Sequence, residues 1–365
     1  MTEHEPPTQP EPSPSPSPFT EGVPFTEDEN RALHETLRAV VADGATPGGV
    51  VVTGTVGGDR AVLTAGAVAP ERSPEPPDRH TVYDVASLTK VIATWPLVGR
   101  AVDQGLIDLD APVRDALPPM SGDTPSGEPT VRQLLAHTGG LRATTRLDRY
   151  WNAELPLHEV LCRDPLEDTP GRAHRYINRG YVLLGLALAH VHRQPLDELA
   201  DALWAGLGLR DTVYGPVARS PRVAPTEQRL PGVPRVWGSV HDDNAAVLGG
   251  IAGHAGVFTT TSDLATFAER LLAAHADEGS ALGAWFRAGL VPQAVMAPGL
   301  HRGLGWITAH EGRVAYHHGF TGTSLYLSPT TGRYLAICTN AVHNGPSRTR
   351  IAPLRSLALK TASTT

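Results

Sequence analysis

Ser87 and Lys90 are the residues of this sequence best placed to do chemistry, because they lie three positions apart at the start of an apolar run, Val91 to Val98. That pattern predicts a buried helix whose first turn carries both side chains on one face. A serine hydroxyl becomes a nucleophile when a base removes its proton, and a neutral amine one turn away can do so. The free N–H groups at the helix start could hold an oxyanion. The pair therefore predicts nucleophilic catalysis by Ser87, with Lys90 as the base.

Lysine is rare in this chain. It occurs only at Lys90 and Lys360, so that 29 of the 31 basic residues are arginine. Arginine stays protonated in proteins, whereas a desolvated lysine can lose its proton and act as a base. The alternative is a serine N-cap followed by an incidental lysine, since S-x-x-K occurs by chance in many sequences. The scarcity of lysine favours the catalytic interpretation.

The stretch Tyr176–Asn178 follows Pro170–Gly171 and precedes a predicted helix. A tyrosine at that place can relay the serine's proton to the leaving group. The amide of Asn178 can orient Lys90 and a substrate amide. The alternative is that Tyr176 covers the core and leaves its hydroxyl at the surface.

A second stretch, His317–Phe320, ends a predicted strand. Gly319 would let a substrate lie along the strand edge. The backbone N–H of Phe320 is predicted to be the second oxyanion donor, beside the N–H of Ser87. A purely structural histidine pair is the alternative.

Other kinds of site find little support. His241–Asn244 could mimic a metal site, but no partner lies at ligand spacing, so a loop-capping role is favoured and no metal is expected. The glycines of 249–256 lack the strand and helix that flank a nucleotide-binding loop, and they predict close backbone packing instead. The sequence contains no G-x-S-x-G, H-E-x-x-H or P-loop motif. We expect no cofactor.

Together these motifs resemble the serine β-lactamase and penicillin-binding-protein superfamily, and within it the class C β-lactamase-like branch. Ser87–Lys90 resembles its S-x-x-K box, Tyr176–Asn178 its Y-x-N box, and His317–Gly319 its third box. The third box is K-T-G in true lactamases and often H-x-G in esterase-like members. Further segments are similar to the branch as well: 130–141, 241–245 and 252–258. The resemblance extends over residues 26–362.

The resemblance implies that Ser87 is the nucleophile, that Lys90 and Tyr176 are the general base and acid, and that the intermediate is an acyl-enzyme. By the same resemblance, Asn178 and His317 bind substrate. Histidine stands in place of the K-T-G lysine, which is the residue expected to hold a β-lactam or peptide carboxylate. Ile177 and His318 likewise stand where serine and threonine are usual, so the match to the esterase pattern is loose.

Three functions are compatible with these residues. The first is a hydrolase of esters or strained amides acting on a small acyl substrate. The second is an acyltransferase, or transacylase, that passes the acyl group to an amine or alcohol; the choice depends on whether the cleft excludes water. The third is a binding or sensor homologue that does not turn over a substrate. All three motifs are filled in this sequence, which counts against this third function.

Bulk composition fits a globular protein. Of its 365 residues, 41% are hydrophobic and 19% charged, and the net charge of −7 gives no reason to expect nucleic acid or an anionic membrane as a partner. No apolar run is long enough to span a membrane. Cys162 and Cys338 match no disulfide framework and are expected to be buried and reduced. The first 25 residues are acidic and rich in Pro and Ser, which predicts a disordered extension, not a signal peptide, and hence a cytoplasmic protein.

Strand patterns near both ends enclose a largely helical middle. Predicted strands are Val50–Val56, Ala61–Ala67, Arg313–His317, Thr323–Leu327 and Tyr334–Thr339, the strand pattern returning after Gly299. Predicted helices are Thr26 to about Gly44, Val131–Leu135, Tyr181–His192, Ser262–Ala274 with Ser262 as N-cap, and about Ser347–Ala362. We therefore predict an α/β (α+β) domain over 26–365. An antiparallel sheet from 26–117 and 296–365, flanked by helices, would face a mainly helical lobe over 118–295 across a cleft.

Overall fold

The computed structural model describes residues 22–71, 74–150, 152–345 and 348–364. Most of the predicted N-terminal extension, residues 1–21, lies outside the described residues, as does Ser347, the predicted start of the last helix. The described end of the extension packs on the domain. The Arg333 side chain donates hydrogen bonds to the carbonyl oxygens of Val23 and Pro24 at 2.8 and 2.6 Å.

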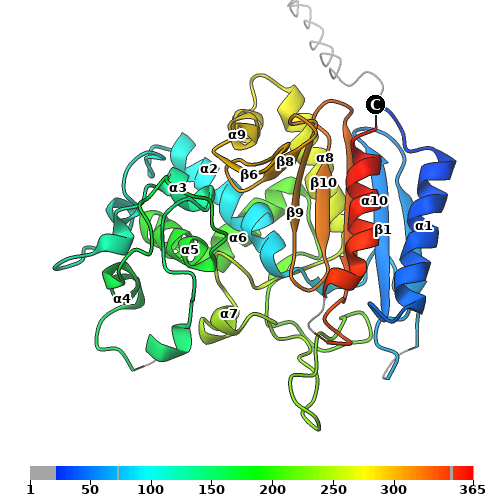
Figure 1. Cartoon of the computed structure of the whole chain (residues 1–365), viewed down its shortest axis with the longest axis horizontal. Helices are drawn as coiled ribbons and strands as arrows, with labels where there is room; N and C mark the ends of the chain where they lie inside the picture. Colours follow the sequence, from blue (N-terminus) through cyan, green and yellow to red (C-terminus); the bar gives the residue numbers. More distant parts are fainter. Residues whose placement is uncertain (1–21, 72–73, 151, 346–347, 365) are drawn as a thin grey trace, which may run out of the picture.

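An antiparallel sheet of eight strands forms the centre of the described structure, in the order β2-β1-β11-β10-β9-β8-β7-β6. Its strands are β1 (Gly48–Thr55), β2 (Ala61–Gly66), β6 (Ala294–Ala297), β7 (Leu300–Arg302), β8 (Ile307–Ala309), β9 (Val314–His318), β10 (Ser324–Leu327) and β11 (Arg333–Thr339). β1 pairs with β11, so that Val51 faces Ile337 across the ladder. The two ends of the chain therefore build one sheet, which confirms the predicted fold class (Figure 1).

Strands β6, β7 and β8 were not predicted individually. Each has only three or four residues, too few for a period of two to stand out in the sequence. They acquire their strand conformation from pairing in series with β9.

Helices cover both faces of the sheet. On one face lie α1 (Glu27–Ala42) and α10 (Ala352–Ala362), whose buried residues form one apolar cluster with Tyr316 and Tyr326 (Figure 1). α1 begins with the predicted capping box, in which Thr26 Oγ1 accepts the N–H of Glu29 at 3.1 Å. α8 (Thr261–Ala276) packs against β1 and β11.

The predicted N-cap of α8, Ser262, is wrong by two residues. The N-cap is Thr260, whose extended backbone lets its Oγ1 accept the N–H of Asp263 at 3.1 Å. Four hydroxyl residues follow one another here, Thr259 to Ser262, and only Thr260, three positions before Asp263, has this geometry.

The remaining helices lie beside the sheet, and a small three-stranded sheet has the order β3-β5-β4. They are α2 (Trp95–Asp103), α3 (Val131–Leu135), α4 (Leu157–Arg163), α5 (Asn178–His192), α6 (Leu196–Leu207), α7 (Asp243–Val247) and α9 (Ala281–Leu290). The small sheet consists of β3 (Tyr83–Asp84), β4 (Val213–Tyr214) and β5 (Val257–Thr259). No described helix combines the length and apolar character needed to cross a membrane.

The segment that carries Ser87 is not the single regular helix that its apolar pattern predicts. A 3₁₀ turn, Ala86–Leu88, is followed by a π-helical turn, Lys90–Thr94, and α2 begins only at Trp95. The N–H of Trp95 reaches back five residues to the carbonyl of Lys90. Sequence periodicity identified the buried run correctly but not its helix type.

Pro96 gives a physical reason for this irregularity. Proline has no N–H, so it cannot bond the carbonyl of Ile92 four residues earlier, and its ring crowds that carbonyl. The indole Nε1 of Trp204 donates to Ile92 O instead, at 2.8 Å. A side chain of α6 thus donates to a buried carbonyl that Pro96 cannot serve.

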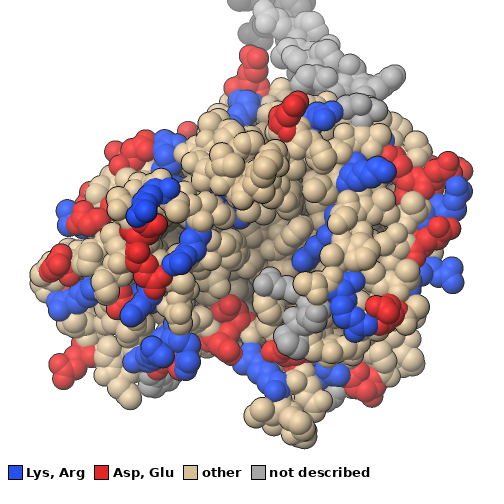
Figure 2. Space-filling model, in the orientation of Figure 1, with Lys and Arg blue, Asp and Glu red and all other residues tan. Residues whose placement is uncertain are grey.

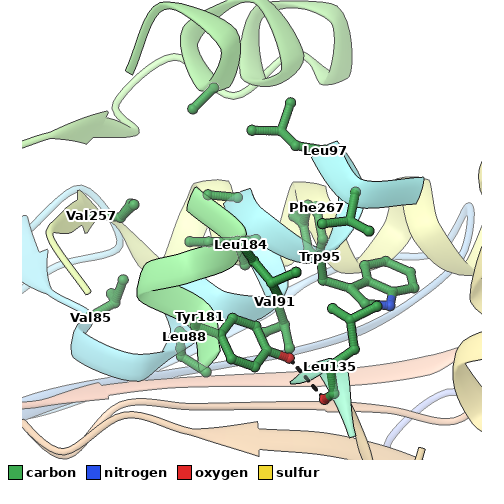
Figure 3. Packing of buried hydrophobic residues seen from close by; sticks show 14 of the residues in the cluster. Val85, Leu88, Val91, Trp95, Leu97, Leu135, Tyr181, Leu184, Val257 and Phe267 are labelled. Carbon is green, nitrogen blue, oxygen red and sulfur yellow. Dashed lines mark hydrogen bonds between the residues drawn. The ribbon is translucent and has the colours of Figure 1, made fainter. Parts of the chain in front are cut away.

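The Ser87 segment is embedded in the main apolar core. Val85, Leu88, Val91 and Trp95 are completely buried, and Figure 3 shows them packed among residues of α5 and α8. The hydroxyl of Tyr181 donates to the carbonyl of Leu135 at 3.1 Å within this cluster. Such a surrounding holds the segment rigidly, because a close-packed interior leaves little room for displacement.

Candidate active site

A cavity of about 520 Å³ opens between the sheet and the helices. It is lined by five of the residues singled out in the sequence: Ser87, Tyr176, Asn178, His317 and Phe320. Figure 2 shows a hollow near the middle of this face, in the region between α7 and β9 of Figure 1, with few charged side chains on its floor. A larger hollow of about 710 Å³ lies beside the hairpin of β1 and β2, and none of these five residues lines it.

A tight turn presents Ser87 to the cavity. Ala86 has a positive φ of 46°, in the left-handed region that residues other than glycine rarely adopt. Its N–H donates to Asp84 Oδ1 at 2.8 Å, and the other oxygen of Asp84 accepts the N–H of His241 at 2.6 Å. Burial raises the pKa of Asp84, although both N–H donors act in the opposite direction. This buried carboxyl group therefore holds together the turn and the loop on the far side of the cavity.

Lys90 lies directly beneath Ser87 and is completely buried. Its Nζ is 2.9 Å from Ser87 Oγ, 2.7 Å from Tyr176 Oη and 3.2 Å from the carbonyl oxygen of His254. A neutral amine has two N–H groups and one lone pair, so it can donate to the carbonyl and still accept a proton from one of the two hydroxyls. The arrangement can therefore pass protons between Ser87 and Tyr176 through Lys90.

The hydroxyl of Tyr176 faces Lys90, although 43% of this residue is exposed. The ring of His137 lies against the Tyr176 ring, with the two centroids 4.4 Å apart, and His137 Nδ1 accepts the N–H of Ile177 at 3.3 Å. α5 begins at the next residue, Asn178. The Oδ1 atom of Asn178 is buried without a hydrogen-bond partner in the described structure, so it can accept an N–H from a bound amide.

His317 closes the other side of the cavity. Its ring is 2% exposed, and neither ring nitrogen has a hydrogen-bond partner among the described residues. Burial lowers the pKa of His317 well below its usual value, and the basic groups of Arg302 and Lys90 nearby lower it further. The imidazole is therefore neutral at neutral pH and can both donate and accept a hydrogen bond.

Gly319 is where the sheet meets the Ser87 segment. A Cβ atom on Gly319 would lie 2.4 Å from the carbonyl oxygen of Val85 and 2.0 Å from Thr323 Oγ1. Only glycine lets the end of β9 come this close. Thr323 Oγ1 also donates to Val85 O at 3.0 Å, which fixes the sheet edge against the turn that presents Ser87.

Arg302 of β7 is a cavity residue that the sequence analysis did not identify. It is 1% exposed and lines the cavity, and its guanidinium carbon lies 5.8 Å from the centre of the Tyr176 ring. Its nitrogens donate to Gly305 O at 3.2 Å and to His174 Nε2 at 3.4 Å, and no carboxylate of the described residues is among the groups that act on it. In a chain with 29 arginines, no local motif separates this one from the others.

Positive charge and neutral rings dominate the surroundings of Arg302. Burial lowers the pKa of His174 to about 4, and Arg302 contributes to that shift. Burial also lowers the pKa of His137 well below its usual value, with Arg302 and Lys90 as further causes. This side of the cavity therefore favours a negatively charged group.

Metal ligation finds no support among the described residues, where no suitable group of His, Cys, Asp and Glu occurs. Asp242 instead caps α7 by accepting the N–H of Ala245 at 2.9 Å, as the loop-capping interpretation predicts. The same oxygen of Asp242 lies 2.8 Å from His254 Nε2. Although burial acts to raise it, these two contacts hold the pKa of Asp242 well below its usual range.

Comparisons with known proteins agree with this architecture. The family model described as Beta-lactamase matches residues 33–360. The chain is 29% identical over 308 residues to a protein of Escherichia coli (strain K12) described as "Putative D-alanyl-D-alanine carboxypeptidase", covering 72% of this chain and 70% of that protein. Two solved structures are similar in fold. One is a class C beta lactamase (TM-score 0.73, 17% identity, 93% of this chain and 98% of that one), and the other is EstCE1, a hydrolase with promiscuous acyltransferase activity (TM-score 0.71, 19% identity, 91% and 99%).

Proposed function

The chain belongs to the beta-lactamase family, and we propose that it is a serine hydrolase that cleaves an ester or an amide through an acyl-enzyme on Ser87. The observation that carries this proposal is the position of Lys90 Nζ, within hydrogen-bonding distance of both Ser87 Oγ and Tyr176 Oη. A fully buried amine between the hydroxyls of two residues that line a cavity is suited to activating a nucleophile.

In the proposed reaction, Ser87 Oγ attacks the acyl carbon while its proton passes to Lys90. The carbonyl π electrons move to oxygen, and the N–H groups of Ser87 and Phe320 stabilise the resulting oxyanion. When the C–O or C–N bond breaks, Tyr176 donates a proton to the leaving group and regains one from Lys90. Water then attacks the acyl-enzyme, and the same groups run in reverse to release the acid.

Intact-mass measurement with a thioester donor tests the acyl-enzyme directly. The wild-type protein should gain the mass of the acyl group and lose it again in water, while Ser87→Ala should gain nothing. A wild-type protein that never gains this mass, with esters, thioesters or a fluorophosphonate probe, would contradict the proposed function.

Arg302 suggests the kind of substrate. A buried guanidinium without a carboxylate partner is costly, and a carboxylate on the substrate would offset that cost. Arg302 would then supply, from β7, the cation that is missing at His317 in the third motif. We therefore propose acyl donors that carry a carboxylate near the scissile bond; D-alanyl-D-alanine peptides, named in the description of the E. coli relative, are the first to test.

A pair of matched donors tests this assignment. N-acyl-D-alanyl thioglycolate has a carboxylate, and its thioglycolamide counterpart has none. A hydrogen bond to a charged group contributes about 1.5–3 kcal/mol. Arg302→Met should accordingly lower kcat/KM for the acid by about 10- to 150-fold and change that for the amide little. Arg172→Met, at an exposed arginine, is the control. Equal losses on both donors would show that Arg302 does not recognise the carboxylate.

Transfer of the acyl group to an amine or alcohol is the second candidate function. The promiscuous acyltransferase activity of EstCE1, which is similar in fold, favours it, and the exposure of Tyr176 lets an amine or alcohol compete with water for the acyl group. An adduct that clears only when amine or alcohol is added would support transfer, whereas a permanent adduct would support a sensor. A cytoplasmic site of action stays a prediction.

A further inference from the structure

Arg355 of α10 reaches the peptide group next to the candidate oxyanion site. Its Nη2 donates to the carbonyl oxygen of Gly319 at 2.9 Å and to that of Thr323 at 3.0 Å, while its Nε donates to Ser324 Oγ at 3.0 Å. α10 packs on the sheet beside β10 (Figure 1). Arg355 is absent from the lining of the cavity and lines a separate hollow with Tyr316.

The bonded carbonyl belongs to the peptide that supplies the proposed oxyanion donor. The C=O of Gly319 and the N–H of Phe320 are two ends of one planar amide. The cis peptide of the described chain is Gly215–Pro216, so this amide is trans, and its C=O and N–H point in opposite directions. Because Arg355 holds the C=O on the side of α10, the N–H is directed away from α10, toward the cavity that Phe320 lines.

A cation on this carbonyl also changes the strength of the N–H as a donor. A charge-assisted hydrogen bond withdraws electron density from the amide, which makes its N–H more positive. Hydrogen bonds in series strengthen one another by roughly 10–30% each in condensed-phase estimates. The effect is greatest when the N–H faces a full negative charge, as it does in the tetrahedral intermediate.

We propose that Arg355 is a positioning residue of the oxyanion site, which both orients and polarises the Gly319–Phe320 peptide from the side of the sheet that substrate does not reach. This inference rests on the proposed function, because it needs an oxyanion on an acyl group attached to Ser87. No residue of α10 lines the cavity, but through Arg355 this helix would directly affect the rate of acylation.

The test uses Arg355→Met and Arg355→Lys with the same thioester donor. In Arg355→Met the acylation rate constant should fall at least tenfold while KM changes less than threefold. A ¹³C-labelled acyl-enzyme should show its carbonyl stretch at higher frequency by infrared difference spectroscopy, because a weaker donor polarises the carbonyl less. Arg355→Lys keeps the charge, so its acylation rate and carbonyl frequency should lie between those of wild type and Arg355→Met. If Arg355→Met does not fold, these two measurements on Arg355→Lys test the role of Arg355.

Arg350→Met is the matched control. Arg350 also donates to backbone carbonyls, those of Asp43 and Gly44, but it bonds neither Gly319 nor Phe320. It should leave the acylation rate and the carbonyl frequency unchanged even if it lowers the melting temperature.

Two failures can be told apart. If wild-type protein forms no acyl-enzyme, the proposed function fails. If wild type acylates, and a folded Arg355 variant acylates at the same rate with an unchanged carbonyl frequency, only the role of Arg355 fails. A slower rate without a frequency shift would also overturn the proposal, since it would show a structural contribution of α10 alone.

Discussion

Replacing Lys90 by arginine separates the two things that a buried basic residue can provide, a positive charge and a site that accepts a proton. Arginine keeps the charge but cannot lose its proton in a protein. General-base catalysis contributes about 10²–10⁴-fold to a rate. Lys90 Nζ is 2.9 Å from Ser87 Oγ, so losing this base should cost about 2.7–5.4 kcal/mol of transition-state stabilisation.

The matched control is Lys360→Arg, because Lys360 is the other lysine of the chain and lies exposed in α10. The assay is the acylation rate with a thioester donor, together with urea unfolding. Lys90→Arg should acylate at least a hundredfold more slowly, while Lys360→Arg should match wild type. Overpacking by the larger guanidinium should destabilise the Lys90 variant by about 1–3 kcal/mol.

Lys90→Met separates packing from chemistry. It removes a completely buried amine and its three hydrogen bonds at nearly constant volume. This variant should fold and stay inactive, because the methionine thioether keeps the volume but cannot take the proton of Ser87. Wild-type acylation by Lys90→Arg would refute the reasoning, because it would show that charge alone is required at this position.

Three further outcomes are expected. Gly319→Ala would place a Cβ 2.4 Å from a backbone carbonyl oxygen and should slow acylation at least tenfold. The control is Gly206→Ala in α6, where a Cβ would meet open space; urea unfolding should show it to be as stable as wild type or slightly more stable. Trp204→Phe removes the donor to the carbonyl of Ile92, and the buried acceptor left behind should cost about 1–3 kcal/mol of unfolding free energy. Because burial lowers the pKa of His317, the unfolded chain binds the proton more readily, so stability should fall as pH drops below about 6.5. His317→Gln should flatten that slope by up to about 1.4 kcal/mol per pH unit, and an unchanged slope between pH 7 and pH 5 would contradict the assigned burial.

Local sequence patterns determined most of the secondary structure. The capping box at Thr26, the hairpin of β1 and β2, and the strands β9 to β11 follow from side-chain periods and turn residues that lie within about ten positions of one another. The nucleophile and base were also recognisable, because Ser87 and Lys90 lie within one turn. Such features need no knowledge of distant residues.

Where the local pattern failed, distant residues decided the structure. The Ser87 segment combines 3₁₀, π and α turns, and Trp204 of α6 donates to the carbonyl of Ile92, to which Pro96 cannot donate. Strands β6 to β8 exist because β9 offers them an edge to pair with. Propensity is a weak guide wherever tertiary contacts supply the stabilisation.

The motif residues of the cavity could be predicted as a set, but their geometry could not. Tyr176 lies 86 positions from Lys90 in the chain, and only the packing of α5 against the Ser87 segment brings their side chains within 2.7 Å. The sequence determined which chemical groups are available, because hydroxyl, amine and amide are properties of the residues themselves. Tertiary structure alone distinguished Arg302 and Arg355 from the other arginines, because burial, partners and direction give a guanidinium its function.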